Sequence, residues 1–563
     1  MLPTQANSFS ELISGGHVIL YAVLSLINGA LLFFASLKFL LVLQQSGYKG
    51  KRYFKWLKEP TTPYLSRLML LCLLGFLFFC VLGVCFTPVC QAFFDEDGKT
   101  FAAYGGFFAH IFFTVIYINT ESSVNAKIPL KKTKRLIRLC ITYVILATLF
   151  TFGVITLLNY VAFIINEEIY AILRFAPICI TPIFAPFLLY LANLINSPFE
   201  KLIARHYVKG ATEKLARTDV IKIGITGSYG KTSVKEILKT ILSQKYRVLA
   251  TPKSYNTPMG ISLSVKNLDN TYDVFIAEMG ARHKGDIKDL VKIVKPKYGV
   301  LTGINNQHLE SFGSIEDIKE TKYELMTALP KDGAAFFSAD NEYTAKMYGD
   351  YVGEKYSAGI NGGFVWAADI KTERTGTSFT LNIKGETPVN CSTVLLGKHS
   401  ISNISLAAAI AYKIGMSPEE ISQGINRLQT VEHRLELVPN NKDIVIIDDS
   451  YNSNIDGAKS AIEVLGMFTG RKIVLTPGLV ELGKIENAEN FKFGKMLAGI
   501  ADIVIIVGRH NAEALIAGLT EGGMDKASIR FSKNAKRGND ELNEIIKEGD
   551  VVLFENDLPD NYS

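Results

Sequence analysis

The chain has 563 residues, 48% of them hydrophobic, and a formal net charge of +6. A chain of that length has room for about three or four domains rather than one. The charge is uneven: two loops, at 45–67 and 120–138, each hold six Lys or Arg against one Glu and together carry +10, so the remainder is slightly acidic. This distribution excludes a general nucleic-acid-binding surface, and no nucleic-acid partner is expected.

Cysteine usage excludes two further classes of site. Six of the seven cysteines lie in or beside apolar runs near the N-terminus, and only Cys391 lies elsewhere. No CxxC or Cys/His pairing indicates zinc, and the spacing is not that of a disulfide framework. We therefore expect buried thiols.

Five apolar segments dominate the first part of the chain. Each is long enough to meet the roughly 19 residues that a helix needs to cross the hydrocarbon core of a bilayer. No A-x-A-like cleavage site follows the first, which disfavours a removable signal peptide, and three prolines make the fifth irregular. Residues 1–200 are thus predicted to form a multi-pass membrane domain with about five transmembrane helices and the lipid bilayer as a partner. The segments lie near 18–43, 68–92, 101–119, 139–165 and 169–195.

The loops between these segments predict an orientation. The two basic loops alternate with short acidic ones, at 95–97 and 167–168. Lys/Arg enrichment marks the cytoplasmic side of a membrane, so the N-terminus is expected outside and residues 200–563 inside. ATP is found on that inner side.

A phosphate-binding motif follows the membrane domain. A strand is expected at 220–225 and a helix at 233–243, with the sequence TGSYGKT at 226–232 between them. Glycine lets backbone amides close around phosphate, the helix N-terminus favours an anion, and a lysine adds a mobile charge. Ile225 occupies the place of the first glycine in the full G-x-x-x-x-G-K-[ST] pattern. The predicted nucleotide-binding residues here are Gly227, Ser228, Gly230, Lys231, Thr232 and Ser233.

One further side chain stands where a metal ligand is often found. Glu278 ends an expected strand at 272–277, where a carboxylate can hold Mg²⁺ through its oxygens. His308 follows another expected strand at 298–301, and Lys322 lies in an expected helix at 315–329. Taken singly, each of the three is more often an ordinary structural residue, and only the family resemblance described next implies a metal-binding role for His308 and Lys322.

The motifs together resemble the Mur ligases, the amino-acid-adding enzymes of peptidoglycan precursor synthesis, and most closely the D-alanyl-D-alanine-adding (MurF-like) members. The resemblance covers about residues 215–500 and implies a central P-loop ATPase domain at 215–428 and a C-terminal Rossmann-like, doubly wound α/β domain at 430–563. The matching stretches are the TGSYGKT loop, SYNTPMG (254–260), AEMGA (277–281) with GDI (285–287), NQHLE (306–310), TKYEL (321–325), GKHSISN (397–403), HRL (433–435) and DDSYNSN (448–454).

The same resemblance implies roles for individual residues. ATP and Mg²⁺ are the expected cofactors, with Thr232, Glu278, His308 and Lys322 holding metal and Lys322 acting as a carbamate formed with CO₂. Lys231, His308 and Lys322 are the expected catalytic residues. Positions that resemble nucleotide contacts are Asn403 near adenine, Arg434 on phosphate and Asp449 on ribose.

The expected reaction is ATP-dependent amide bond formation through an acyl phosphate, at the cytoplasmic face of a bacterial plasma membrane. The expected substrates are a UDP- or lipid-linked muramoyl peptide and an amino acid or dipeptide such as D-alanyl-D-alanine. Two alternatives are a synthetase of another amide polymer, such as a polyglutamate-like one, and a non-catalytic nucleotide-dependent scaffold.

The chain departs from the family at three places that bear on its substrates. Nothing in residues 1–215 resembles a uridine site, and Ile455 stands in place of a proline. The K-G-S stretch that follows the last strand in related chains is replaced by acidic residues that begin at Glu555. This last change affects the expected recognition of the amine or of the acceptor peptide.

Overall fold

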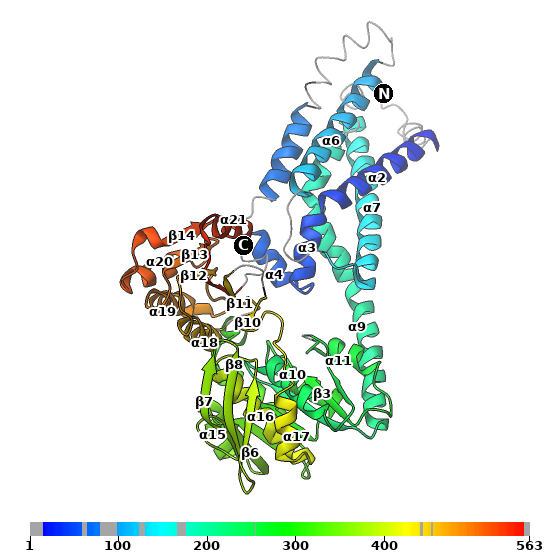
Figure 1. Ribbon diagram of the computed structural model, residues 1–563. Helices are drawn as coiled ribbons and strands as arrows, with labels where there is room; N and C mark the ends of the chain where they lie inside the picture. The colour runs from blue at the N-terminus through cyan, green and yellow to red at the C-terminus, as the bar shows by residue number, and fades with distance from the viewer. Residues whose placement is uncertain are drawn as a thin grey trace. The chain divides into compact units, whose positions relative to one another are not determined.

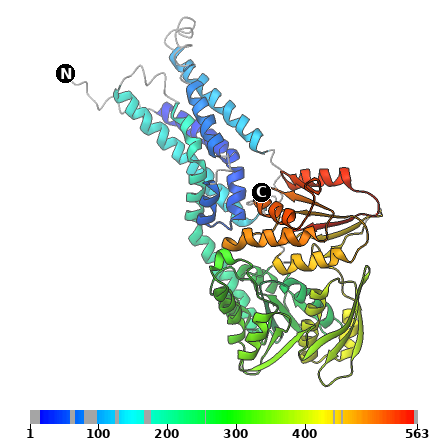
Figure 2. The same ribbon diagram turned by 90° about the vertical axis from the view of Figure 1, so that its left-hand side faces the viewer.

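The computed structural model describes residues 15–58, 65–78, 81, 98–122, 130–165, 176–253, 255–439, 443–451 and 454–556. These residues form two compact units, one within Met1–Ile203 and one within Ala204–Leu558, and each is described by itself (Figures 1 and 2). The predicted acidic loops at 95–97 and 167–168, the motif residues Ser254, Asn452 and Ser453, and the acids from position 557 onward lie outside the described residues.

The first unit is helical. The predicted segment at 18–43 is two helices rather than one, because the chain bends at Ser36, whose hydroxyl lies 2.6 Å from the Tyr143 hydroxyl. Prolines interrupt the last segment, as the sequence predicts: a 3₁₀ helix that contains Pro182 precedes the long α9. The helices are α2 (Gly15–Ala35), α3 (Leu37–Gln45), α4 (Gly50–Leu57), α6 (Gly98–Ser122), α7 (Lys134–Ile165), η2 (Ala176–Phe184) and α9 (Ala185–Arg217), which continues into the second unit.

Three helical stretches among the described residues are long and apolar enough to cross a membrane. They are Val18–Ala35, Lys134–Val161 and Ile178–Arg217. Leu65–Phe78 and Phe107–Thr120 are apolar but shorter. The number of five transmembrane helices stays a prediction, since the segment at 68–92 is described only in part.

A buried polar cluster joins four of these helices. The Asn28 side-chain nitrogen of α2 donates to the hydroxyls of Thr151 (3.0 Å) and Thr181 (2.8 Å), and its oxygen lies 3.0 Å from Nε2 of His110. All four side chains are buried. Satisfied polar groups of this kind fix the register of helices that apolar contacts alone would leave free to slide.

The second unit contains two sheets in two domains, the middle domain and the C-terminal domain (Figure 1). The middle-domain sheet has nine strands in the order β2-β3-β1-β4-β5-β6-β7-β8-β9, parallel up to β7 and antiparallel from β7 to β9. The strands are β1 (Ile221–Thr226), β2 (Val248–Ala250), β3 (Val274–Glu278), β4 (Tyr298–Leu301), β5 (Ala334–Ser338), β6 (Glu354–Gly359), β7 (Val365–Glu373), β8 (Gly376–Ile383) and β9 (Val389–Thr393).

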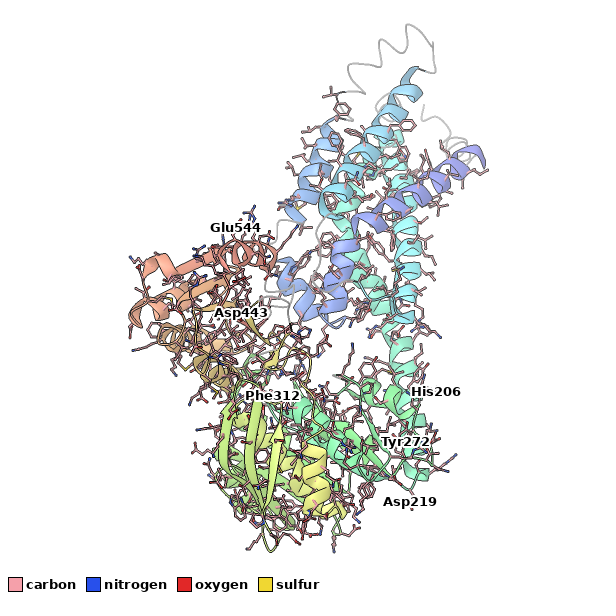
Figure 3. All side chains as sticks on the ribbon, in the orientation of Figure 1. His206, Asp219, Tyr272, Phe312, Asp443 and Glu544 are labelled. Carbon is pink, nitrogen blue, oxygen red and sulfur yellow. The ribbon has the colours of Figure 1, made fainter. Side chains whose placement is uncertain are left out.

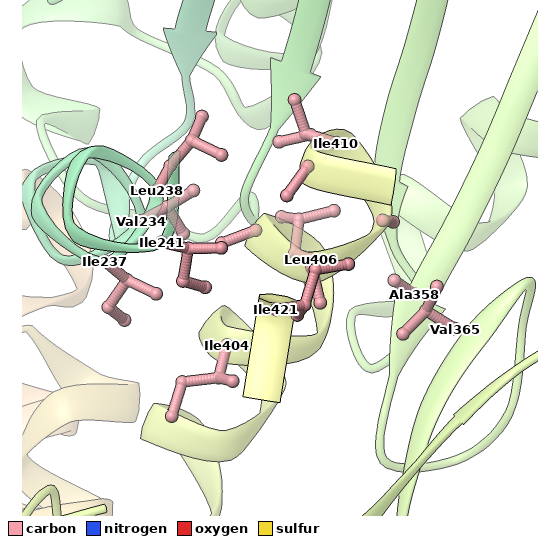
Figure 4. Close-up of a cluster of buried hydrophobic side chains, with 14 of the residues drawn as sticks. Val234, Ile237, Leu238, Ile241, Ala358, Val365, Ile404, Leu406, Ile410 and Ile421 are labelled. Carbon is pink, nitrogen blue, oxygen red and sulfur yellow. The ribbon is translucent and has the colours of Figure 1, made fainter. Parts of the chain in front are cut away.

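Helices cover both faces of this sheet, which makes the domain three-layered. On one face, Val234, Leu238 and Ile241 of α10 are fully buried against α16 and α17 (Figure 4). The helices of this face are α10 (Lys231–Leu242), α16 (Lys398–Ile414) and α17 (Pro418–Ile425). The other face carries the end of α9 with α11 (Pro258–Val265), α12 (Asp286–Val294), α14 (Ile315–Thr327) and α15 (Glu342–Asp350), and the short α13 (Leu309–Phe312) precedes α14.

The C-terminal sheet has six strands in the order β10-β11-β15-β12-β13-β14, all parallel except β10. Helices α18 to α20 pack on one face and α21 on the other, so the predicted doubly wound α/β domain is confirmed. Helices α18 and α19 lie on the side that faces the middle domain (Figure 2). The elements are β10 (Glu436–Leu437), β11 (Val445–Asp449), α18 (Ile455–Gly466), β12 (Lys472–Thr476), η3 (Gly483–Ile485), α19 (Glu486–Ala498), β13 (Ile503–Val507), α20 (Ala512–Glu521), η4 (Lys526–Ser528), β14 (Ile529–Ser532), α21 (Ala535–Ile545) and β15 (Val551–Glu555).

Candidate active site

The glycine-rich loop connects β1 to α10, as the sequence predicts. Gly227 and Gly230 have φ values of +154° and +75°. A Cβ on Gly227 would lie 2.1 Å from Thr302 Oγ1, and one on Gly230 would lie 3.0 Å from Asn403 Oδ1. Glycine is therefore required at both positions. The loop ends at the N-terminus of α10, where free backbone amides favour an anion, and Ser233 lies in the first turn of that helix.

Two of the predicted metal ligands meet beside this loop. Strands β1 and β3 are parallel neighbours, so their carboxyl ends place α10 next to Glu278, the last residue of β3. The Thr232 hydroxyl donates to Glu278 Oε2 (3.0 Å), and the Asn256 side-chain nitrogen donates to Oε1 (3.1 Å). Glu278 is 1% exposed, so its carboxylate is held in place by these donors rather than by water.

A lysine that the sequence argument did not single out also holds this carboxylate. Lys235 Nζ lies 3.3 Å from Glu278 Oε2 and donates to the backbone oxygen of Lys253 at 2.6 Å. Its side chain is completely buried. Because an unpaired buried charge is costly, this ion pair helps to keep both charges buried.

Lys231 is folded back onto the loop. Its ammonium donates to the carbonyls of Gly227 (2.7 Å) and Ser228 (2.9 Å). Burial lowers the pKa of Lys231 to about 8; the charge of Glu278 opposes the shift and that of Arg434 adds to it. Groups from both domains of the second unit therefore act on this lysine.

Lys322 is buried on α14, 2% exposed. Burial lowers the pKa of this lysine well below its usual value, and the positive charge of Lys231 lowers it further. Its nitrogen lies 5.9 Å from the centre of the Phe312 ring, and no hydrogen-bond partner for it is found in the part of the chain that the structure describes. A neutral amine is the form that reacts with CO₂, so this environment suits the predicted carbamate.

His308 stands at the start of α13 with a left-handed backbone, φ +63°. Burial lowers the pKa of His308, which favours the neutral ring that ligates metals. Phe312, at the other end of α13, lies on the side of the middle domain that faces the C-terminal domain (Figure 3).

The predicted nucleotide contacts of the C-terminal domain lie together. The Arg434 guanidinium stacks 4.7 Å from the centre of the Tyr451 ring, and Asp449 accepts from the Leu435 amide at 3.1 Å. Burial raises the pKa of Asp449 to about 6, against the opposing charge of Arg434. Glu555, where the chain departs from the K-G-S stretch, is buried and lies in register with Asp449 on the neighbouring strand.

A hydrogen-bonded contact between the middle and C-terminal domains flanks the phosphate loop. The Asn305 side-chain nitrogen donates to Asn454 Oδ1 (2.9 Å) and to Asp456 Oδ2 (2.8 Å), both at the start of α18. The Asn305 carbonyl accepts from the Ser228 hydroxyl at 3.3 Å. The loop and the C-terminal domain are thereby linked through one residue.

The side chains present fit ATP and a divalent cation. Thr232 and Glu278 offer hard oxygen donors at the mouth of the phosphate loop, the kind of ligand that Mg²⁺ prefers. Within the described residues, no group of three or more His, Cys, Asp or Glu is arranged to hold a metal ion. The predicted ligand set does not require one, because it combines a hydroxyl, one carboxylate, one imidazole and a modified lysine.

The structure brings most predicted residues together, and it adds three that sequence reasoning missed. These are Lys235, Asn305 and Glu481, whose carboxylate reaches His308 from the C-terminal domain. Lys235 had a usable signal, since it lies four residues after Lys231 on the same face of α10. Asn305 and Glu481 had none, because their partners are 149 and 173 residues away in the chain.

Two domain families match the second unit. Residues 225–411 match the family described as Mur ligase middle domain, and residues 433–555 match the one described as Mur ligase, glutamate ligase domain. Both matches lie after the first unit of the chain.

Individual proteins are similar over the same part. The UDP-N-acetylmuramoyl-tripeptide–D-alanyl-D-alanine ligase of Escherichia coli is 30% identical over 315 residues, which is 54% of this chain and 69% of that protein. The enzyme of the same description from Bacillus subtilis is 29% identical over 339 residues, covering 59% and 72%.

Solved structures agree on the fold. The structure described as MurF ligase from Thermotoga maritima in complex with ADP is 27% identical, with a TM-score of 0.57 over 63% of this chain and 80% of that one. MurF from Acinetobacter baumannii is 25% identical, with a TM-score of 0.58 over 63% and 77%.

Proposed function

Because the chain belongs to the Mur ligase family and is an ATP-dependent ligase, we propose that it adds D-alanyl-D-alanine to a muramoyl tripeptide. The observation that supports this most is the meeting of Thr232 with Glu278 at 3.0 Å beside the phosphate loop, with Lys231 and Arg434 close enough for their charges to interact. Curated relatives with this reaction share about 30% identity across two thirds or more of their length.

The proposed reaction has two steps. An oxygen of the acceptor carboxylate attacks the γ-phosphorus of ATP, the bond to the β–γ bridging oxygen breaks, and ADP leaves. The amine nitrogen of the dipeptide then attacks the acyl carbon, phosphate departs with the electron pair of the C–O bond, and the amine loses a proton. Activation of this kind is needed because a carboxylate does not react with an amine by itself.

Each chemical requirement of these two steps is met by a side chain in the site. Lys231 and Arg434 supply positive charge where charge builds on the transferred phosphoryl group. Thr232 and Glu278 would hold one Mg²⁺, and His308 with Lys322 as a carbamate would support a second. Bound Mg²⁺ would neutralise charge on the phosphoryl oxygens. Asn403 and Asp449 would orient the adenosine.

Membrane attachment is part of the proposal. Three apolar helical stretches between residues 18 and 217 and the basic loop around Lys131 and Lys132 support a multi-pass protein with its catalytic domains in the cytoplasm. The acceptor is then either UDP-linked or lipid-linked.

The test is release of ADP and phosphate by the purified full chain in detergent. UDP-linked and lipid-linked muramoyl tripeptides are each supplied with D-alanyl-D-alanine, and glutamate with a polyglutamate primer is supplied in parallel. We expect release only with a muramoyl tripeptide and the dipeptide together, and mass spectrometry should show the amide product. Release with glutamate and primer alone would favour the polymer synthetase; release with none would contradict the proposed reaction.

A further inference from the structure

One carboxylate of the C-terminal domain reaches into the middle domain beside the predicted metal ligands. Glu481 lies between β12 and η3. Its Oε2 is hydrogen-bonded to Nδ1 of His308, and its Oε1 accepts from the Arg282 guanidinium at 3.2 Å. Both carboxylate oxygens are therefore committed to side chains of the other domain.

The loop that carries Glu481 is built to present it rigidly. Leu479 and Leu482, on either side, are 2% exposed and belong to the core of the C-terminal domain. The Asn490 side chain holds the backbone of Leu479: its oxygen accepts from the Leu479 amide (2.8 Å), and its nitrogen donates to the Leu479 carbonyl (2.9 Å). Glu481 and His308 both have left-handed backbones, at φ +65° and +63°. Strain of this kind on two residues that meet is typical of a functional contact.

The contact fixes the tautomer of His308. An ionised carboxylate only accepts hydrogen bonds, so Nδ1 must carry the proton. Nε2 is then the ring nitrogen with a lone pair, and no partner for it is found among the residues that the structure describes. Metal-binding histidines commonly donate their second ring N–H to a carboxylate, which orients the ring and makes it a better ligand.

We propose that Glu481 is a positioning residue for His308, so that the metal site at His308 is complete only when the C-terminal domain is closed on the middle domain. This inference rests on the proposed function, in which His308 supports a second divalent cation. It adds a residue from the other domain, and it makes metal affinity depend on domain closure. Glu481 is assigned a positioning role because its two oxygens are bonded to Arg282 and to His308.

The experiment measures Mn²⁺ binding to the full chain in detergent with ADP present. Pulsed electron paramagnetic resonance detects the coupling of Mn²⁺ to a histidine nitrogen, so it reports the site at His308 and needs no turnover. We expect Glu481→Gln, which keeps the shape but loses the charge, to raise the apparent Kd of the nitrogen-coupled Mn²⁺ by about 10-fold or more. Glu481→Ala should raise it at least as much.

Glu486→Gln is the matched control. Glu486 lies 2.7 Å from Nε2 of His510 and accepts from the Leu482 amide at 3.1 Å, so it is also a carboxylate paired with a histidine and it touches the same loop. Both of its partners lie in the C-terminal domain. Its substitution should leave the nitrogen-coupled Mn²⁺ unchanged.

A double substitution tests whether Glu481 acts through His308. His308→Ala should abolish the nitrogen coupling, and adding Glu481→Gln should change total Mn²⁺ binding no further, because coupled residues give non-additive effects. The inference is overturned by an unchanged Kd in Glu481→Gln, by an equal loss in Glu486→Gln, or by the absence of nitrogen coupling in the unsubstituted protein. Failure of the ADP-release assay with muramoyl peptides would refute the proposed reaction without altering these binding results.

Discussion

We expect the Lys231 side chain to lower the free energy of unfolding of the ligand-free protein, although the same side chain is needed for turnover. Its ammonium is held inside the loop by two carbonyls, and burial lowers its pKa from 10.5 to about 8. A lowered lysine pKa means that the folded state holds the proton less tightly than the unfolded state. The cost is therefore fully present below pH 8, shrinks as pH rises between the two pKa values, and is gone above about 10.5.

The size of the effect follows from the shift. At about 1.4 kcal/mol per pKa unit, the drop corresponds to roughly 3 kcal/mol at neutral pH. Lys231→Met removes this cost but also removes two hydrogen bonds, whose net contribution is about 1 kcal/mol each. A gain of roughly 1 kcal/mol remains. For a domain of about 200 residues, that is a rise in Tm of about 2 to 4 °C.

The chain offers a clean optical probe for this measurement. It contains two tryptophans, and Trp366 lies on β7 of the middle domain. In a Trp56→Phe background, thermal unfolding followed by tryptophan fluorescence therefore reports the domain that holds the loop. We expect Lys231→Met to unfold at higher temperature at pH 7 without ligand, and its advantage to be lost by about pH 9.5, because the ionisation cost shrinks while the loss of the two hydrogen bonds stays constant.

Nucleotide should reverse the order of the two proteins. Saturating ADP with Mg²⁺ at about 100 times Kd stabilises the unsubstituted protein by about 2.7 kcal/mol, whereas the variant lacks the cation that binds phosphate. Turnover by the variant should fall at least about 10²-fold. A lower Tm for ligand-free Lys231→Met at pH 7 would refute the reasoning from burial, and near-normal ligation would show that this loop is not the catalytic phosphate site.

Three further predictions concern other parts of the chain. If Lys322 works as a carbamate, Lys322→Arg should be inactive, and short carboxylic acids should partly restore Lys322→Ala; full activity of Lys322→Arg in the ADP-release assay would contradict the assignment. Lys235→Met removes the cation nearest to the buried Glu278 carboxylate, so the free energy of unfolding in EDTA should fall by roughly 3 kcal/mol. Added Mg²⁺ should recover more stability in this variant than in the unsubstituted protein; a loss that Mg²⁺ does not recover would point to packing alone. A cysteine introduced at position 97 should react with an impermeant maleimide on intact cells and one at Lys132 should not, and the reverse result would overturn the predicted orientation.

The sequence predicted those parts of the site that are encoded locally. The strand, glycine-rich loop and helix around Lys231 are adjacent in the chain, and the end of a parallel strand at Glu278 follows from its apolar run. Parallel strands end at one edge of a sheet, which explains why Thr232 and Glu278, both given as metal ligands by the family resemblance, meet in the structure. The contacts between the two domains were not predictable in this way, since Glu481 meets His308 only when the middle and C-terminal domains fold against each other.

Burial is the other property that the sequence did not reveal. Lys235 and Lys322 look like ordinary polar residues on amphipathic helices, yet each is at most 2% exposed. The segment at 18–43 shows the same limit in the first unit, where continuous apolar sequence predicted one helix and the polar Ser36, paired with Tyr143, divides it into two. For Lys235 and Ser36, the partners Glu278 and Tyr143 lie far away in the chain.

Burial and neighbouring charge together explain why two lysines of the site have lowered pKa values. Lys231 interacts with the charge of Arg434, and Lys322 interacts with the charge of Lys231. Burial lowers the pKa values of both lysines, and these repulsions lower them further. In the proposed reaction, a nucleotide triphosphate would relieve this repulsion, and conversion of Lys322 to a carbamate would place an anion beside the proposed second metal. Under that proposal, the groups that destabilise the ligand-free site are the ones that would favour ATP with divalent cations.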